Sequence, residues 1–566
     1  MGSDQATMNV ITLFLTCLTA CLLCIDSTGR LSFHWLTASV LTAFIITYPT
    51  SYLPQWLRRG TQLIIGETFI FICLVDCYCQ EIFFTPITPQ VLSNVLLSNV
   101  REANEFFSTF IGYHVLWHWR ISTLLILAIA LPPLLFFLRK PLFLHDTVKY
   151  AMMALLGLCL ICEAPATYRY SLLFFQGQDL QEMEGLVFRH YHEEIPTPIH
   201  RMAFASYSLR ISSRMLSSIK HSTFSAKPDS CSYRSPHIVL IIGESYNKHH
   251  AEIYGYSKAT TPLQKQRMKN GELFVFNDIM TPWNITSNVF LEIFSLWENG
   301  MKETTSSMPL FPMLFRRAGY TVNFFSNQYL LRGWRRGSTN QTGHFFLADA
   351  EMSDSLFSYR NRKHRKFDMG LVEQVADYKM TKAPSDYTLD IIHLIGQHFD
   401  YSLRYPHSTA KFTLNDYADR NLSTESKEIV MHYDNATHYN DMVLDSLLCL
   451  YKQENAIVVF VADHGEEVYD ELPVHGRLFQ EPTAAQARQE FEVPMWIWCS
   501  ASYRNYHPDI VKRIELSVRK PFMTDGIPQL LLYLAGISSK WNDDSRNLLS
   551  PNYRCKKRVI CGSTAL

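Results

Sequence analysis

The sequence lacks an excess of charge of either sign. It contains 52 Lys plus Arg and 52 Asp plus Glu, which gives a formal net charge of +0. Nucleic-acid-binding proteins usually carry a basic excess, so the composition gives no support to a nucleic-acid partner. Charged residues make up only 18% of the chain, below the usual value of about a quarter, and this shortage points towards a membrane protein.

The polar part of the chain also lacks the cysteine pattern of a zinc knuckle. Its cysteines form no C-x-x-C pair: Cys231, Cys449, Cys499, Cys555 and Cys561. Cys555 and Cys561 are close enough in sequence to close a small loop in an oxidising compartment, but an odd number of cysteines defines no pairing. The others lie in apolar stretches and are interpreted as small buried hydrophobic residues: Cys17, Cys21, Cys24, Cys73, Cys77, Cys79, Cys159 and Cys162.

The first apolar run, Met8–Ile25, has almost no basic residues before it and no small-residue cleavage site, so a membrane span is favoured over a removable signal peptide. Most other long apolar runs also fall within residues 1–165. Because about 20 apolar residues cross a bilayer, they predict about five spans in all. The expected spans are Met8–Ile25, Trp35–Leu53, Leu63–Cys79, Ile121–Leu138 and Tyr150–Ala164.

Basic residues set the expected orientation of these spans. If successive spans cross the membrane in alternating directions, five basic residues lie on the same side: Arg58, Arg59, Arg139, Lys140 and Lys149. The positive-inside rule makes that side the cytoplasm, so everything after Ala164 lies outside it. We therefore expect a transmembrane domain at 1–165 with a long interfacial loop at 82–120, an amphipathic linker at 166–235 and a large extracytoplasmic domain at 236–566.

Two acidic residues, Glu67 and Asp76, fall inside the third expected span. A charge is costly in hydrocarbon and usually faces protein or water. Each is interpreted either as a functional group or as an ordinary helix-end acid. Trp117 and Trp119 follow at the end of the 82–120 loop, where their rings suit a bilayer interface.

From Pro236 onward, short apolar strands alternate with helical patterns. This alternation predicts an α/β domain with a mainly parallel sheet. In open sheets of this kind, functional sites gather at the carboxyl ends of the strands. The expected strands are Ile238–Ile242, Tyr320–Phe325, Leu389–Ile395, Ile457–Val461 and Met495–Trp498.

Asp463 and His464 directly follow the expected strand Ile457–Val461. A carboxylate and an imidazole on one loop can bind the same cation, and Gly465 is expected to let the backbone bend sharply behind them. Zinc accepts both ligand types at about 2.0–2.2 Å, so the pair supplies half of a four-coordinate site. An ordinary turn is the alternative interpretation of this Asp-His-Gly sequence.

Residues with metal-binding or substrate-binding chemistry also follow the other expected strands. Each alone is explained by a turn, a cap or a surface histidine, but their recurrence at successive strand ends favours a shared site. Glu244, Asp463 and His464 would leave a fourth zinc position open, as catalytic zinc requires. In chain order the residues at or after the strand ends are Glu244, Ser326-Asn327-Gln328, His393, Gln397-His398 and His475.

A hydroxyl side chain at that open position would have a lowered pKa and become a nucleophile. Thr286 and Ser287 precede an apolar helical stretch, and Thr281 lies nearby. A helix N-terminus there would favour a bound phosphate through its backbone N–H groups. The residue types do not separate the three hydroxyls, and ordinary N-capping is the alternative for each.

A series of motifs resembles, in its order, the phosphoethanolamine transferases. These are inner-membrane enzymes of Gram-negative bacteria that modify lipid A or the lipopolysaccharide core, and they belong to the alkaline-phosphatase/sulfatase superfamily. The subgroup that modifies the core heptose is most similar in D-H-G-E-E-V-Y-D (463–470) and S-N-Q (326–328). The motifs are I-I-G-E-S (241–245), Y-G-Y-S-K-A-T-T-P (254–262), the Thr286 stretch, F-F-S-N-Q (324–328), H-L-I-G-Q-H-F-D-Y-S-L-R-Y-P (393–406), Y-N-D (439–441) and A-D-H-G-E-E (462–467).

The resemblance implies a multi-pass enzyme of the inner membrane with a periplasmic, sulfatase-like catalytic domain and one or two zinc ions. Glu244, Asp463 and His464 match the family's zinc ligands, and Thr286 matches both a ligand and the nucleophile. Thr286 would take phosphoethanolamine from phosphatidylethanolamine and release diacylglycerol. The group would then pass to a phosphate or a sugar hydroxyl of lipid A or the lipopolysaccharide core.

Further positions match family residues that bind substrate or a second metal. His398 and His475 match ligands of a second zinc or of the phosphate, and Asn327 matches a substrate-binding amide. Asn99 and Glu102 resemble the family's lipid-contacting N-x-x-E-A motif. The sequence departs from the family at two points, so the stabilisation of the leaving group and the identity of the acceptor stay open. A lysine of some relatives is replaced by Leu330-Leu331-Arg332, and the disulfide set of the colistin-resistance subgroup is missing.

Other functions on the same scaffold define the alternatives. A phosphoglycerol transferase or a phosphohydrolase is the first alternative. Residue types alone exclude these enzymes less firmly than they exclude a sulfatase. A sulfatase would need Cys or Ser in a C/S-x-P-x-R context, and Thr286–Phe290 lacks the Pro and the Arg. A catalytically inactive membrane scaffold would normally have lost a ligand, whereas all four matched ligands are present.

Overall fold

The structure is a computed structural model of the chain. It describes residues 2–25, 33–83, 86–89, 91–92, 113–137, 146–176, 183, 186, 195–298, 301, 303–328, 346–478, 482–555, 557–561 and 564–565. It divides into two compact units: Met1–Ser212 with Leu478–Gln480, called here the helical unit, and Ser213–Arg477 with Glu481–Leu566, called the α/β unit. The predicted limits of the domains and of the interfacial loop stay predictions.

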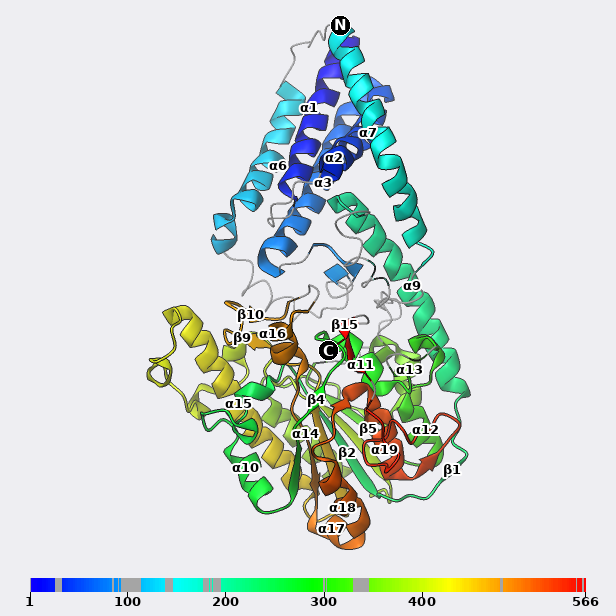
Figure 1. Cartoon of the computed structure of the whole chain (residues 1–566), viewed down its shortest axis with the longest axis vertical. Helices are drawn as coiled ribbons and strands as arrows, with labels where there is room; N and C mark the ends of the chain where they lie inside the picture. The colour runs from blue at the N-terminus through cyan, green and yellow to red at the C-terminus, as the bar shows by residue number, and fades with distance from the viewer. Residues whose placement is uncertain are drawn as a thin grey trace. The chain divides into compact units, whose positions relative to one another are not determined.

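Long apolar helices build the helical unit (Figure 1). Their bounds are α1 Gly2–Leu23, α2 Phe33–Thr47, α3 Gln55–Phe83, α6 Trp119–Phe137 and α7 Asp146–Leu173. α1 packs against α2, α3 and α6, and Leu13, Cys17, Phe69 and Leu131 are buried in the same core. Each expected span coincides for most of its length with one of these helices, and the predicted helical membrane region is confirmed.

Three of these helices are long and apolar enough, among the described residues, to cross a membrane: Trp56–Ile82, Trp119–Phe136 and Tyr150–Leu173. α1 contributes a shorter apolar stretch, Asn9–Leu23. α2 has 15 residues, which rise about 22 Å against a hydrocarbon core of about 30 Å. The α-helix ends at Thr47 and Pro49 opens a 3-10 helix, η1 (Tyr48–Tyr52), so the predicted end at Leu53 is too late.

The cysteines of the apolar stretches are mostly buried, as expected for small hydrophobic residues. The buried ones are Cys17, Cys21, Cys24, Cys73, Cys77, Cys79 and Cys159. Cys162 is exposed, because α7 carries few buried residues around it. Cys555 and Cys561 are both free thiols in the structure.

A seven-stranded sheet forms the centre of the α/β unit, in the order β3-β11-β8-β2-β7-β5-β6. Neighbouring strands from β6 to β8 pair in parallel, and β11 is antiparallel to both β8 and β3. All the expected strands are present, and the predicted mainly parallel α/β fold is confirmed. The bounds are β2 His237–Gly243, β3 Leu273–Phe276, β5 Thr321–Ser326, β6 Tyr359–Arg360, β7 Thr388–His393, β8 Ala456–Ala462 and β11 Met495–Cys499.

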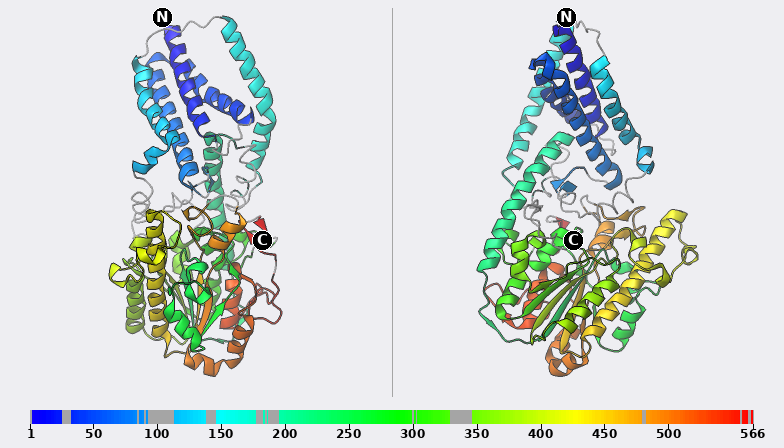
Figure 2. Two further views of the ribbon diagram at one scale, coloured as in Figure 1. Left: turned by 60° about the vertical axis from the view of Figure 1, so that its left-hand side comes forward. Right: turned by 180° about the vertical axis from the view of Figure 1, so that it is seen from behind.

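Helices cover both faces of this sheet, which explains why its central strands are apolar along their length. β2 and β8 are almost completely buried. α14 (Asp368–Thr381) and α15 (Thr424–Tyr451) lie on one face, and α12 (Phe311–Ala318) and α19 (Ile527–Ala535) on the other (Figure 1, Figure 2). The edge strands β3 and β6 were not expected, because runs of four and two residues carry too little pattern.

The carboxyl ends of the parallel strands meet at one edge of the sheet. Gly243 at the end of β2 pairs with Ala462 at the end of β8. On the other side of β2, His393 of β7 pairs with Ile242 and with Ser326 of β5. Side chains that follow these strands are therefore brought together, as the sequence argument requires.

Candidate metal and nucleophile site

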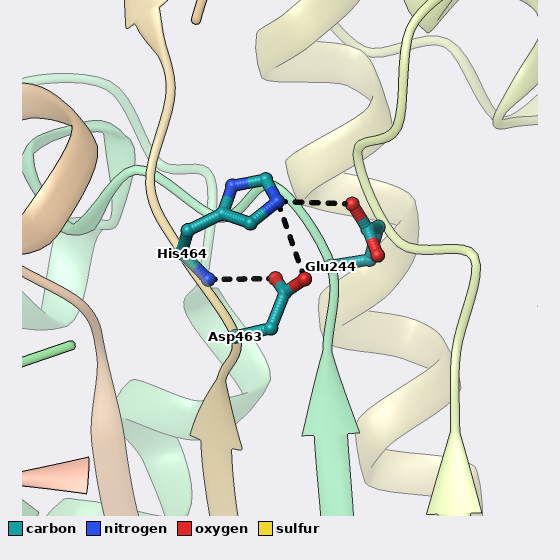
Figure 3. Close-up of side chains that lie close together, drawn as sticks. All are labelled: Glu244, Asp463 and His464. Carbon is teal, nitrogen blue, oxygen red and sulfur yellow. Dashed lines mark hydrogen bonds and ion pairs between the residues drawn. The ribbon is translucent and has the colours of Figure 1, made fainter. Parts of the chain in front are cut away.

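Three side chains converge where β2 and β8 end. Glu244 follows β2, and Asp463 and His464 follow β8 (Figure 3). All three are completely buried. One ligand atom from each lies within 4.8 Å of the others, so the group has the composition and spacing of a metal site.

The separations between these atoms fit a tetrahedral ion. His464 Nε2 lies 3.3 Å from Glu244 Oε1 and 3.2 Å from Asp463 Oδ2. Ligands at about 2.0–2.2 Å from a tetrahedral zinc ion lie roughly 3.3–3.6 Å from one another. The three donors therefore stand close to the positions that zinc binding requires.

The hydrogen bonds of Asp463 and His464 leave acceptor atoms that face the proposed metal position. Asp463 Oδ1 accepts hydrogen bonds from the backbone N–H groups of Ser245 and His464, at 3.1 and 2.7 Å. Among the described residues, the buried Asp463 Oδ2 has no hydrogen-bond partner. His464 Nδ1 donates to the Gly465 carbonyl at 2.8 Å, so the Nε2 lone pair faces the two carboxylates. A buried, electron-rich group of this kind calls for a cation.

The pKa shifts in the site follow from burial and from the close approach of charged groups. Burial raises the pKa of Asp463 well above its ordinary value, and the negative charge of Glu244 adds to this shift. Burial opposes ionisation of Glu244 too, but contacts with His393 and His464 lower its pKa well below the ordinary value. Burial and the Arg477 cation lower the pKa of His464. Two buried carboxyl groups this close to each other oppose each other's ionisation, so a bound cation is expected to favour the ionised form of both.

Tight backbone geometry holds the two loops together. Ser245 has a φ of 54°, in the left-handed region that non-glycine residues rarely adopt, and its hydroxyl donates to Glu244 Oε1 at 2.9 Å. The predicted reason for Gly465 is different from the observed one. A side chain at Gly465 would collide with the backbone carbonyl of Gln489, so this glycine permits close packing of two segments. Its backbone does not have the positive φ of a left-handed bend.

The structure separates the three candidate hydroxyls. Thr286 begins α11 (Thr286–Phe294), and its Oγ1 lies 3.2 Å from His464 Nε2 and 3.4 Å from each oxygen of Glu244. Thr281 instead accepts a hydrogen bond from Thr524. No contact of Ser287 with the three ligands is found in the described part of the chain. Thr286 is therefore the hydroxyl whose geometry suits a nucleophile beside the metal site.

Glu244 is oriented by a residue that the sequence analysis placed at a strand end without giving it a role. Gln328 donates to Glu244 Oε2 at 2.9 Å, and His393 Nε2 lies 3.7 Å from the same oxygen. Its neighbour Asn327, the predicted substrate amide, uses both ends of its own amide on Asp368 and the backbone N–H of Arg365. The choice between two adjacent amides depends on which one points towards the strand end, and the sequence carries no signal for that.

The remaining predicted residues are not joined to this cluster by a hydrogen bond or ion pair between described residues. His398 is buried and donates from Nδ1 to its neighbour's carbonyl at 2.7 Å, so its Nε2 can act as a ligand. Burial lowers its pKa to about 4, while Glu244 acts against that shift. His475 Nδ1 lies 3.0 Å from the Tyr469 hydroxyl. Their roles stay predictions; Asn99 and Glu102 lie outside the described residues, as do Leu330-Leu331-Arg332.

Arg477 is the residue at this site that the sequence argument missed. Its Nη1 donates to His464 Nε2 at 2.9 Å and to the Asn284 carbonyl at 3.2 Å. The only signal in the sequence is its position two residues after His475, at the end of a strand of two residues that is too short to predict.

Comparisons with known proteins agree with this arrangement. A family model described as Sulfatase matches residues 236–531. The chain is similar to phosphoethanolamine transferase EptC of Escherichia coli strain K12, with 28% identity over 329 residues that cover 57% of this chain and 55% of the relative. It is also similar to the Kdo(2)-lipid A phosphoethanolamine 7''-transferase of that strain, with 26% identity over 267 residues that cover 47% of this chain and 45% of the relative. The chain thus spans about half the length of the curated relatives it matches.

Two solved structures extend the comparison. The zinc complex of the C-terminal periplasmic domain of EptC from Escherichia coli has a TM-score of 0.51 and 26% identity, and covers 59% of this chain and 93% of that chain. The integral membrane protein lipooligosaccharide phosphoethanolamine transferase A (EptA) from Neisseria meningitidis has a TM-score of 0.62 and 17% identity. That similarity covers 95% of this chain and 97% of that chain, so the fold is shared over the helical and the α/β unit alike.

Proposed function

Because this chain belongs to the sulfatase family, we propose that it is a zinc-dependent phosphoethanolamine transferase of the bacterial inner membrane. The observation that carries the proposal is the position of Thr286, whose Oγ1 lies 3.2 Å from one atom of a buried three-ligand group. A hydroxyl beside metal ligands is suited to act as a nucleophile. The similarity of this chain to phosphoethanolamine transferases supports phosphoethanolamine as the group that is transferred.

The residues present fit a zinc ion. Glu244, Asp463 and His464 would hold it, because they combine two carboxylates with an imidazole whose lone pair faces them. When bound, zinc supplies positive charge that lowers the pKa of the Thr286 hydroxyl and attracts a phosphate. Gln328 and Ser245 hold Glu244 in place through hydrogen bonds to its two oxygens. A second ion is proposed to involve His398 and His475.

The reaction proceeds in two balanced halves. In the first, Thr286 Oγ1 forms a bond to the phosphorus of phosphatidylethanolamine, and the bond from phosphorus to the diacylglycerol oxygen breaks. The diacylglycerol oxygen takes up a proton, which balances the proton that Thr286 gives up. In the second, an oxygen of the acceptor forms a bond to the same phosphorus while the bond from phosphorus to Thr286 Oγ1 breaks. The proton that the acceptor gives up balances the one that restores the Thr286 hydroxyl.

The proposed partners follow from the family and from the membrane helices. Phosphatidylethanolamine is the donor, and lipid A or a sugar of the lipopolysaccharide core is the acceptor. Asn327 is proposed to bind substrate, and Asn99 and Glu102 to contact the donor lipid. The α/β unit would then act in the periplasm, on the side of the membrane where the spans leave it.

A single experiment tests donor, nucleophile and reaction type together. Detergent-purified, zinc-loaded protein is mixed with labelled phosphatidylethanolamine and no acceptor, and diacylglycerol release is followed. Mass spectrometry is expected to find phosphoethanolamine on Thr286. Label transfer from phosphatidylglycerol alone would assign the protein as a phosphoglycerol transferase, and steady release of free phosphoethanolamine would assign a hydrolase. A metal-free protein that reacts with neither lipid would favour an inactive scaffold.

A further inference from the structure

Arg477 places a cation directly against the proposed metal ligands. Its Nη1 lies 2.9 Å from His464 Nε2, the same atom that lies 3.2 Å from Thr286 Oγ1. Arg477 is half-buried, so its guanidinium is held by the protein but is still within reach of a ligand. Burial acts to lower the pKa of Arg477, but the carboxyl groups of Glu466, Glu244 and Asp463 raise it above its ordinary value.

The contact between Arg477 and His464 competes with metal binding. His464 Nδ1 carries the ring proton and donates it to the Gly465 carbonyl, so Nε2 has a single lone pair to offer. That lone pair either accepts a hydrogen bond from Arg477 or binds the ion. When His464 ligates a metal, Arg477 Nη1 therefore keeps the Asn284 carbonyl but loses its other acceptor, and the freed N–H can donate to a new acceptor nearby.

A phosphoryl group in transfer supplies that acceptor. The reacting phosphorus must come within bonding distance of Thr286 Oγ1, which shares its contact atom with Arg477. Arginine has five N–H donors in a planar fork that fits two phosphate oxygens. Among the described residues, the hydrogen bonds of Arg477 all start from Nη1, so Nη2 and Nε have no bond to any described residue.

The charge of the site requires a cation of this kind. Glu244 and Asp463 both become anionic when they bind a metal, and a nucleophilic Thr286 oxygen adds a third negative charge. Together they cancel or exceed the charge of a divalent ion, and a phosphate would then meet no net attraction. A fixed guanidinium next to the nucleophile restores attraction without lowering the number of metal ligands.

We propose that Arg477 binds the phosphoryl oxygens of the lipid headgroup and stabilises their charge during transfer to and from Thr286. This role rests on the proposed function for the identity of the lipid. The chemistry that it recognises is a tetrahedral phosphoryl group, either in a lipid headgroup or as free phosphate. It is a catalytic role, because Arg477 would touch the reacting atoms.

The test compares full-length Arg477→Gln and Arg477→Lys with wild type and with Arg488→Gln, a control that changes an exposed arginine of the same region. Zinc content, inorganic phosphate binding by calorimetry, and kcat and KM for diacylglycerol release are measured for each. Arg477→Gln is expected to keep its zinc, to bind phosphate at least about tenfold more weakly and to lower kcat about 10²–10³-fold. Arg477→Lys should recover part of both, and Arg488→Gln should equal wild type.

The outcomes separate this proposal from the proposed function. Loss of zinc from Arg477→Gln would assign a structural role to the arginine and overturn the proposal. Wild-type phosphate affinity in Arg477→Gln would overturn it too, whatever lipid the protein uses. If wild type binds phosphate through Arg477 but releases no diacylglycerol from phosphatidylethanolamine, the arginine site stands and the assigned lipid fails.

Discussion

The two units each bury a cluster of charged side chains, and the clusters differ in how completely they are satisfied. In the helical unit, Asp76 of α3 and Arg201 of α9 (Pro198–Ser225) are both fully buried and joined at 2.6 and 2.9 Å. In the α/β unit, Glu244, Asp463 and His464 are equally buried. Burial alone therefore does not distinguish a structural cluster from a functional one.

The Asp76–Arg201 pair is balanced in charge and rich in hydrogen bonds. The Asp76 carboxylate also accepts from Gln80 at 2.7 Å and from the backbone N–H of Ile87 at 2.9 Å. Arg201 donates in turn to the Pro196 carbonyl at 2.9 Å. This explains why an acid inside an apolar helix is tolerated: it holds α9 against α3, and the helix-end interpretation of Asp76 is unnecessary.

The α/β cluster is incomplete on the side that faces the proposed ion. Asp463 Oδ2 has no hydrogen-bond partner among the described residues, and two carboxyl groups face one lone pair of His464. A protein of marginal stability retains such an arrangement when a ligand completes it. The comparison teaches that an unsatisfied buried cluster marks a site, whereas a satisfied one marks an anchor.

The largest expected effect is the loss of chemistry in Thr286→Ala. Removal of the nucleophile should lower diacylglycerol release by at least about 10⁴-fold, because no other group in the cluster can carry the phosphoryl group. Zinc content and unfolding temperature should remain those of wild type. Ser287→Ala and Thr281→Ala are the matched controls and should still form the phosphoenzyme. Wild-type release by Thr286→Ala would place the nucleophile elsewhere.

His464→Ala sharpens the comparison by removing one member of the unsatisfied cluster. We expect zinc content to fall from about one ion per chain to near zero, because two carboxylates alone form a weak zinc site. Added zinc should raise the unfolding temperature of wild type but not of this variant, since only a bound ligand stabilises the folded state. His407→Gln, at an exposed position, is the control. Full occupancy in His464→Ala would refute the ligand assignment.

Asp76→Asn breaks the satisfied cluster and should act on stability alone. An unpaired Arg201 would stay buried, at a cost of roughly 3–5 kcal/mol in the free energy of unfolding. Thermal unfolding in detergent measures this loss, and the zinc content should not change. The double variant Asp76→Leu/Arg201→Met should recover most of the stability. A change below about 1 kcal/mol in Asp76→Asn would show that the pair is not an anchor.

An effect that appears only as the pH is raised is expected from His250, which the α/β unit buries between two carboxylates. His250 Nδ1 lies 2.5 Å from Asp434 and Nε2 lies 2.8 Å from Asp470. Burial acts to lower its pKa, but the charges of Asp470 and Asp434 raise it to about 10. Folding therefore keeps a proton that the unfolded chain releases above about pH 6.5.

The sign of the resulting pH dependence follows from this raised pKa. The contribution of His250 is complete below about pH 6.5 and is lost as pH rises towards about 10, with a slope of about 1.4 kcal/mol per pH unit. Denaturant unfolding of the metal-free protein at several pH values measures the slope. His250→Gln should remove the contribution of His250 to this slope, and His407→Gln should leave the slope unchanged. Identical slopes in His250→Gln and wild type would contradict the raised pKa.

Local patterns in the sequence were sufficient for most of the fold. Runs such as I-V-L-I-I in β2 and I-V-V-F-V in β8 predict buried strands because each residue's burial follows from its own apolar character. The rule that sites form at strand ends then placed Glu244, Asp463 and His464 together, since both strands are parallel and adjacent. The short edge strands escaped, because two to four residues show no periodicity.

The sequence by itself determined the apolar helices, the parallel sheet and the three candidate ligands that directly follow β2 and β8. Only the tertiary structure decided that Thr286 contacts two of these candidate ligands, that Gln328 orients Glu244, and that Arg477 reaches His464. It also decided that Asp76 pairs with Arg201, which lies 125 residues away in the chain. The physical reason is that periodicity reports how a residue relates to its near neighbours, whereas these contacts depend on the packing of distant segments.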